Sequence, residues 1–186
     1  MCFDEKKVNC MQSKDKLDDI YSKVDPWGYK TNVDDKKRKD FILDILNNEV
    51  FSKALDIGCG EGWITKDLPA EKIFGYDVSS VAMSRLPRNV TPLENISGKF
   101  DLIIATGVLY KQYDYRWMLG KIKECASGIV LTCNIKSWER NSLRRKIYET
   151  EFPYRRYIER LAVYDLSASR CWEFKESKLQ LKGRDS

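Results

Sequence analysis

Apolar and polar residues are grouped along the chain in blocks that predict strands separated by helices. Five short apolar runs are expected to form strands: 52–57, 72–77, 91–93, 100–106 and 128–133. The segments between them that carry helical patterns are 62–68, 80–86 and 115–125. Strands that alternate with helices predict a parallel sheet covered by helices on both faces, so the expected fold class is α/β.

The two ends of the chain follow different patterns. Segments 157–164 and 171–178 read as two further strands, and the short link 165–170 predicts that they pair as an antiparallel hairpin. Before the first strand, apolar residues at helical spacing predict one amphipathic helix within 11–24 and another from 32–35 to about 48. The apolar positions of these helices are Leu17, Ile20, Tyr21 and Val24 in the first, and Phe41, Ile42, Ile45 and Leu46 in the second. Proline in Asp25-Pro26-Trp27-Gly28-Tyr29 separates the two helices.

The first apolar run leads into a glycine-rich sequence. Leu55-Asp56-Ile57-Gly58-Cys59-Gly60-Glu61-Gly62 predicts a strand and a tight turn, in which glycines let the backbone approach a ligand closely. A dinucleotide site has the spacing G-x-G-x-x-G, but Trp63 holds the place of the third glycine. Asp77 follows the second strand, about 20 residues on, where a βαβ nucleotide site holds an acid.

Composition excludes several classes of protein. The chain has 186 residues, of which 42% are apolar and 33% charged, as in a soluble globular domain. It has no histidine, which excludes Ser-His and Cys-His nucleophile pairs, and its six cysteines form no C-x-x-C pair. We therefore expect no metal site. The absence of a long apolar run and of an apolar leader favours a cytoplasmic protein with reduced thiols and no membrane contact.

The glycine-rich pattern D-x-G-x-G-x-G resembles motif I of the class I S-adenosylmethionine (SAM)-dependent methyltransferases. Together with Asp25-Pro26-Trp27-Gly28-Tyr29 and Phe100-Asp101-Leu102-Ile103-Ile104, it is similar to the small nodulation-type N-methyltransferases and related sugar methyltransferases. The resemblance covers residues 21–178. It implies a Rossmann-like, seven-stranded and mostly parallel sheet with a C-terminal antiparallel hairpin. It also implies one domain, made of a flexible tail (1–10), an N-terminal helical lid (11–48) and a SAM-binding core (49–178).

The resemblance also implies a set of cofactor contacts. The loop after the first strand would wrap the methionyl part of SAM, and Asp77 would accept hydrogen bonds from the ribose hydroxyls. The implied SAM-binding residues are Trp27, Tyr29, Lys37, Asp56, Gly58, Cys59, Gly60, Trp63, Asp77, Val78, Ser79, Asn95, Ile96, Thr106 and Gly107. Among these, Lys37 is the candidate partner of the methionine carboxylate.

The catalytic base remains open at the level of sequence. Family members often carry an acid where Gly107 stands. A hydroxyl nucleophile must lose its proton as it attacks, whereas a neutral amine needs little proton handling. Ligands of open α/β sheets bind at the carboxyl ends of the strands. The candidate catalytic residues there are Tyr110, Asp114 and Glu139, with Asn134 and Lys136 at the same rim.

The densest basic stretch, 140–146 continued by Arg155, Arg156 and Arg160, has three interpretations. It is a solvated helix face, a clamp for the diphosphate of a nucleotide-sugar, or a track for RNA. The sequence thus predicts a SAM-dependent methyltransferase that modifies a hydroxyl, or an amine, of a carbohydrate or another small acceptor. An RNA or cap methyltransferase and a non-catalytic SAM-binding subunit are the alternatives.

Overall fold

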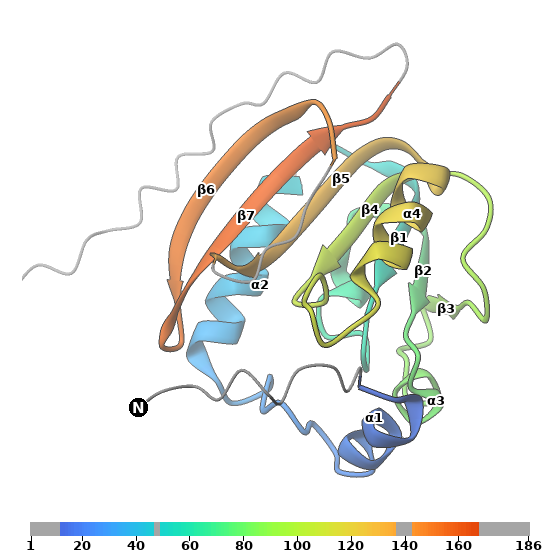
Figure 1. The fold of residues 1–186 in the computed structure, drawn as a ribbon, viewed down its shortest axis with the longest axis vertical. Helices are drawn as coiled ribbons and strands as arrows, with labels where there is room; N and C mark the ends of the chain where they lie inside the picture. The colour runs from blue at the N-terminus through green and yellow to red at the C-terminus, as the bar shows by residue number, and fades with distance from the viewer. Residues whose placement is uncertain (1–11, 47–48, 137–142, 168–186) are drawn as a thin grey trace, which may run out of the picture.

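The computed structural model describes residues 12–46, 49–136 and 143–167. Seven strands form one twisted sheet in the order β3-β2-β1-β4-β5-β7-β6 (Figure 1). The bounds of the strands are β1 Phe51–Ile57, β2 Ala70–Tyr76, β3 Val90–Pro92, β4 Phe100–Thr106, β5 Ala126–Ile135, β6 Lys146–Tyr154 and β7 Tyr157–Asp165. The first five are parallel, and β7 pairs antiparallel with both β5 and β6. The predicted seven-stranded, mostly parallel α/β fold is confirmed.

Helices cover both faces of the sheet, as expected. Helix α2 (Val33–Leu46) packs on one face and α4 (Tyr115–Cys125) on the other, each over its own apolar core. Helix α1 (Lys14–Tyr21) and the short α3 (Ser80–Met83) lie beyond the carboxyl ends of the parallel strands (Figure 1). Among the described residues, no helix is long and apolar enough to cross a membrane.

The two N-terminal helices differ in how well their predicted stripes are buried. In α2, Ile42, Ile45 and Leu46 are buried as predicted. In α1, Leu17 and Tyr21 are buried. Val24 is 73% exposed, because α1 ends at Tyr21. The predicted tail, 1–10, and the predicted end of the second helix at 47–48 lie outside the described residues.

The predicted hairpin exists, but one of its strands was assigned wrongly. Strand β7 matches the predicted segment 157–164, yet its hairpin partner is β6 rather than 171–178. Both edges of β7 are taken by β5 and β6, so no edge is left for a third strand. Segment 171–178 itself lies outside the described residues. The turn consists of Arg155-Arg156, with Arg155 at φ +51°, and it lacks the Gly or Asn that usually marks such a turn.

The helix predicted for 62–68 is also wrong. The chain forms turns there, with a single 3-10 turn, η1, at Thr65–Asp67. Gly62 has a positive φ of +77°, and Pro69 disfavours helical geometry at the residue before it. Similarly, α3 ends at Met83 instead of residue 86, because Pro87 follows.

Candidate functional site

A cavity of about 340 Å³ lies at the carboxyl ends of β1, β2, β4 and β5. Strand order reverses between β1 and β4, and such a switch point is where open α/β sheets bind ligands. One side of the cavity, here called the glycine-loop wall, consists of Ile57, Gly58, Tyr76, Asp77 and Val78. The opposite set, called the hairpin wall, consists of Arg38, Tyr110, Ile135, Tyr154 and Glu159.

Close backbone packing fixes the two glycines of the loop after β1. A Cβ at Gly58 would lie 2.2 Å from the Val108 side chain, and one at Gly60 would lie 2.6 Å from the Tyr21 hydroxyl. Both glycines have positive φ, +77° and +53°, which disfavours any other residue. Gly58 lines both cavities with bare backbone, whereas Gly60 lies against Tyr21 and lines neither.

Asp77 joins this loop to the end of β2. Its carboxylate accepts hydrogen bonds from the backbone N–H groups of Gly60 and Ser79, both at 2.9 Å. Burial raises the pKa of Asp77 above its usual range, and the backbone hydrogen bonds oppose this shift. The carboxylate thus fixes the loop and lines the cavity at the same time.

Asp56 lies beneath the loop. Its Oδ2 accepts a 2.6 Å hydrogen bond from the Thr65 hydroxyl, while its buried Oδ1 has no partner among the described residues. Burial raises the pKa of Asp56 to about 7. Asp56 lines a small adjoining cavity of about 30 Å³ that shares Tyr29, Arg38 and Gly58 with the main one.

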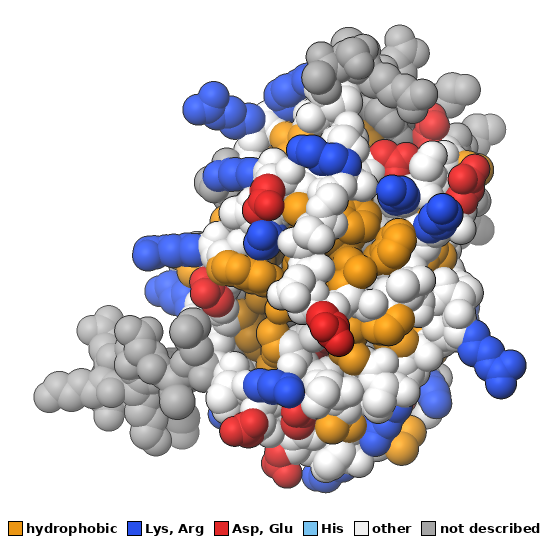
Figure 2. Space-filling model, turned by 90° about the vertical axis from the view of Figure 1, so that its right-hand side faces the viewer, with side chains coloured by type: hydrophobic (Ala, Val, Ile, Leu, Met, Phe, Trp, Pro, Cys, Tyr) orange, Lys and Arg blue, Asp and Glu red, His pale blue; other side chains and the backbone are white. Residues whose placement is uncertain are grey.

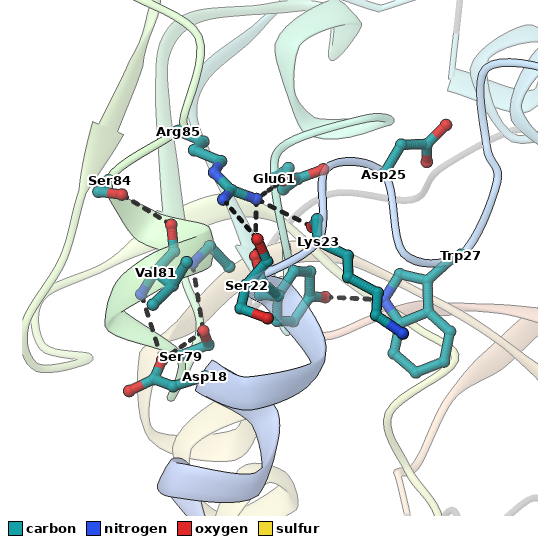
Figure 3. A network of polar contacts seen from close by, with 12 residues as sticks. Asp18, Ser22, Lys23, Asp25, Trp27, Glu61, Ser79, Val81, Ser84 and Arg85 are labelled. Carbon is teal, nitrogen blue, oxygen red and sulfur yellow. Dashed lines mark hydrogen bonds and ion pairs between the residues drawn. The ribbon is translucent and has the colours of Figure 1, made fainter.

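Two side chains, Asp18 and Arg85, bind helix α1 and the residues after it to neighbouring segments (Figure 3). Asp18 accepts hydrogen bonds from the Ser79 hydroxyl at 2.6 Å, the Ser80 hydroxyl at 3.0 Å and the Val81 N–H at 3.2 Å. These bonds, led by the one from Ser79, lower the pKa of Asp18.

Arg85 fastens the other end of the helix. Its guanidinium donates to the carbonyls of Tyr21, Ser22 and Lys23 and pairs with Glu61 at 2.8 Å (Figure 3). Because these carbonyls lie at the carboxyl end of α1, the cation also complements the helix dipole. Arg85 therefore links the carboxyl end of α1 to Glu61 of the glycine-rich loop.

Trp27 and Tyr21 meet above the loop. The Trp27 Nε1–H donates to the Tyr21 hydroxyl at 3.1 Å, and the two rings pack edge to face with centroids 6.2 Å apart. Both side chains line the main cavity. The hairpin holds the same segment from the other side, since Arg155 donates to the Trp27 carbonyl at 2.9 Å and pairs with Asp35 at 2.5 Å.

The hairpin wall contains a buried ion pair. Arg38 Nε lies 3.0 Å from Glu159 Oε2, and both side chains are less than a tenth exposed. The Arg38 guanidinium lies over the Tyr154 ring, 4.9 Å from its centroid. A Cβ at Gly107 would be 3.4 Å from an Arg38 nitrogen, so the arginine occupies the space beside the end of β4.

Most predicted cofactor residues border one of the two cavities. Trp27, Tyr29, Gly58, Asp77, Val78, Thr106 and Gly107 line the main cavity, and Asp56, Cys59 and Trp63 line the small one. Gly60 and Ser79 bind Asp77 from behind. Three residues lie apart. Lys37 and Asn95 are exposed, and Ile96 is buried in the core under α4.

The three candidate catalytic residues lie in different places. Tyr110 lines the cavity, and its hydroxyl accepts a 3.4 Å hydrogen bond from the Ile135 N–H. Asp114 is exposed and caps α4 by accepting from the Trp117 N–H at 3.1 Å. Glu139 lies outside the described residues. Asn134 is buried and accepts from the Leu109 N–H, and Lys136 is exposed and pairs with Glu151.

Residues 140–142 of the basic stretch lie outside the described residues. Its described part, 143–146 with Arg155, Arg156 and Arg160, lies in a loop, in β6 and β7 and in their turn, so the helix-face interpretation was wrong there. Several of its cations are paired within the hairpin: Lys146 with Glu149, and Arg160 with Glu149 and Glu151. The strand signal was the alternation of Tyr148, Thr150, Phe152 and Tyr154 with polar residues. Arg38 and Glu159 were not predicted, because nothing local in the sequence brings these two distant residues together.

No protein-family model matches the chain, and no curated protein is significantly similar to it in sequence. Solved structures are similar in fold. The N-methyltransferase NodS from Bradyrhizobium japonicum WM9, in complex with S-adenosyl-L-homocysteine (SAH), has a TM-score of 0.68 at 18% identity, over 82% of this chain and 97% of NodS. The magnesium protoporphyrin IX methyltransferase ChlM from Synechocystis PCC 6803, with bound SAM, has a TM-score of 0.62 at 16% identity, over 82% and 96%. This chain has the class I methyltransferase fold.

A third structure with this fold widens the range of acceptors. A candidate RNA methyltransferase from Pyrococcus horikoshii has a TM-score of 0.53 at 15% identity, over 87% of this chain and 100% of its own. The class I fold therefore confirms the architecture expected from motif I. The acceptor has to be inferred from the site itself.

Proposed function

We propose that the protein is a SAM-dependent methyltransferase that acts on a small acceptor. The observation that carries this proposal is the glycine-loop wall, where bare backbone at Gly58 and Gly60 adjoins the carboxylate of Asp77 at a strand switch point. A Cβ at Gly58 would collide with Val108 and one at Gly60 with Tyr21, so both positions require glycine. These residues fit SAM, which supplies a methyl group on a positively charged sulfur.

The residues that would hold SAM can be named. In this proposal Asp77 accepts hydrogen bonds from the ribose hydroxyls, and the loop at Gly58 and Gly60 contacts the methionyl part. Arg38 replaces Lys37 as the partner of the methionine carboxylate, because its guanidinium is buried beside Gly107 while Lys37 is exposed. Arginine also suits a carboxylate better, since it can donate two parallel hydrogen bonds.

The acceptor side favours a small molecule. The cavity is lined by the aromatic rings of Trp27, Tyr29, Tyr110, Tyr113 and Tyr154. Such rings pack against sugar or other small rings, and a carbohydrate or another small hydroxylated molecule is the acceptor that we propose. The paired cations of the hairpin leave little support for a diphosphate clamp, so we no longer favour a nucleotide-sugar. Nucleic acid remains the second choice, because Lys and Arg are interspersed with Asp and Glu on the face in Figure 2.

Transfer from SAM with a labelled methyl group tests the proposal. Wild-type protein would be incubated with a neutral oligosaccharide, an amino-sugar oligosaccharide, UDP-glucose and a structured RNA. We expect label in one of the two oligosaccharides and none in the RNA. Label in the RNA alone would reverse the choice of acceptor. SAM binding without transfer to any of the four would favour a non-catalytic subunit.

A further inference from the structure

We propose that Glu159 is the catalytic base that accepts the proton of the acceptor's nucleophilic group. The inference rests on the proposed function and adds to it a residue that sequence reasoning did not identify. It assigns the acceptor to the class of nucleophiles that carry a removable proton, a hydroxyl or an ammonium group, bound against the hairpin wall.

The position of Glu159 on β7 supports this role. Glu159 is one of the residues that line the main cavity, and its side chain is 1% exposed. Both contacts of the carboxylate with described residues go to Oε2, from Arg38 Nε at 3.0 Å and from the Cys133 thiol at 2.9 Å. Oε1 has no polar contact with a described residue, and we infer that it faces the acceptor. Arg38 offsets the cost of burying the charge and holds the carboxylate in one orientation.

Glu159 also compensates for the missing acid at position 107. Cys133, which donates to Glu159, lies on β5 directly beside the end of β4, where its carbonyl accepts from the Gly107 N–H at 2.7 Å. The negative charge therefore reaches the same region of the cavity from another strand.

No other described group that lines the cavity is equally suited. The only other carboxylate among the lining residues is Asp77, which is bound to Gly60 and Ser79 on the glycine-loop wall. Burial raises the pKa of Tyr110, and it raises the pKa of Tyr154 to about 12. These phenols therefore keep their protons at neutral pH, and the histidine-free chain has no imidazole base.

The reaction balances with this assignment. The nucleophile's oxygen or nitrogen forms a bond to the methyl carbon as the sulfur–methyl bond breaks, and that electron pair stays on sulfur. The nucleophile's proton passes to Glu159 and then to solvent. With an amine acceptor, Glu159 removes the proton from the ammonium form before attack. Arg38, Cys133 and Tyr110 are the titratable or charged groups that face Glu159.

The test compares Glu159→Gln with Glu151→Gln, whose carboxylate is ion-paired on the outside of the same hairpin. SAH binding is measured by calorimetry, and transfer of labelled methyl to the two oligosaccharides is measured from pH 5 to 9. We expect Glu159→Gln to bind SAH within about twofold of wild type. Its transfer rate should fall by about 10²- to 10⁴-fold, the range for a general base. Glu151→Gln should behave as wild type.

Three outcomes decide the matter. A Glu159→Gln variant that keeps more than half of the rate would overturn the inference. So would a wild type that binds SAH but methylates neither oligosaccharide, whereas a wild type that binds no SAH would overturn the proposed function itself. If Glu159→Gln loses its fold because Arg38 is left unpaired, Glu159→Asp keeps the charge. That variant should fold, bind SAH and lose at least about tenfold in rate.

Discussion

The two walls of the cavity are built in different ways. The glycine-loop wall comes from one continuous stretch, between Asp56 and Val78, and it is fixed by backbone hydrogen bonds to Asp77. The hairpin wall joins Arg38 of α2 to Tyr154 and Glu159 of the hairpin, residues separated by more than half of the chain. The glycine-loop wall is held by hydrogen bonds to backbone N–H groups, and the hairpin wall is held by a buried ion pair between side chains.

This difference separates the parts that each wall can play. Backbone geometry changes little with side-chain substitution, so the glycine-loop wall suits a constant ligand such as a cofactor. Side chains can be exchanged one at a time, so the hairpin wall is where acceptor choice and proton transfer can be set. Apart from Arg38, which we propose for the methionine carboxylate, substitutions in the two walls should therefore have separable effects on SAH binding and on methyl transfer.

The largest expected effect comes from filling the loop with a side chain. Gly60→Val would place a Cβ 2.6 Å from the Tyr21 hydroxyl on backbone of positive φ. We expect it to abolish SAH binding in calorimetry while circular dichroism shows a folded protein. Gly98→Ala is the matched control, because Gly98 also has a positive φ but nothing within 4 Å of its Cβ position. Normal binding by Gly60→Val would mean that the glycines only make a turn.

A second effect concerns stability and pH. The pKa of Asp56 is about 7 in the folded chain, against an ordinary 3.8. Between these values the folded state binds a proton that the unfolded state does not, so the free energy of unfolding should fall as pH rises from about 4 to 7. The difference of about three pKa units corresponds to at most about 4 kcal/mol.

Asp56→Asn should remove this dependence. Urea unfolding at pH 5, 6, 7 and 8 should show a falling stability for wild type and a flatter profile for the variant. Thr65→Val removes the hydrogen bond that favours the charged form and should steepen the fall. A profile that is the same in wild type and Asp56→Asn would contradict the assignment.

The smallest effect on SAH affinity is expected from substitution of Trp27. Trp27 is bonded to Tyr21 above the loop and, through its carbonyl, to Arg155 of the hairpin. Trp27→Ala should lower SAH affinity several-fold, with a smaller loss of stability than the roughly 3–5 kcal/mol of a core truncation. Trp27→Phe, which removes the N–H but keeps a ring, should lie in between.

Hydrogen exchange supplies a second readout for the lid. SAH should protect residues 20–35 in wild type and change tryptophan fluorescence, because lids become ordered when ligand binds. If Trp27→Ala is unfolded and SAH does not change hydrogen exchange of residues 20–35 in wild type, Trp27 is a core residue and the lid interpretation is wrong.

The sequence predicted Gly58, Asp77 and Val78 of the glycine-loop wall, because a glycine-rich turn and an acid after the next strand are readable locally, but it did not single out Ile57 and Tyr76. The hairpin wall could not be predicted in the same way. Lys37 was chosen over Arg38 since periodicity does not decide between neighbours on a helix whose buried face includes charged residues. Glu159 lies in a strand whose alternation is readable, but its partner Arg38 is fixed only by tertiary packing. The turn at Arg155-Arg156 lacks the usual turn residues. The hairpin was therefore predicted between 157–164 and 171–178 instead of between β6 and β7.

Titration of SAH into wild type, Asp77→Ala and Asp114→Ala tests the central claim most directly. Asp77 lies at the point where the loop, β2 and the cavity meet, whereas Asp114 only caps α4. The account predicts that Asp77→Ala weakens SAH binding by about 1.5–3 kcal/mol, the range for hydrogen bonds to a charged group, while Asp114→Ala binds as wild type. Unchanged SAH affinity in Asp77→Ala, or tight binding of NAD by wild type, would contradict it.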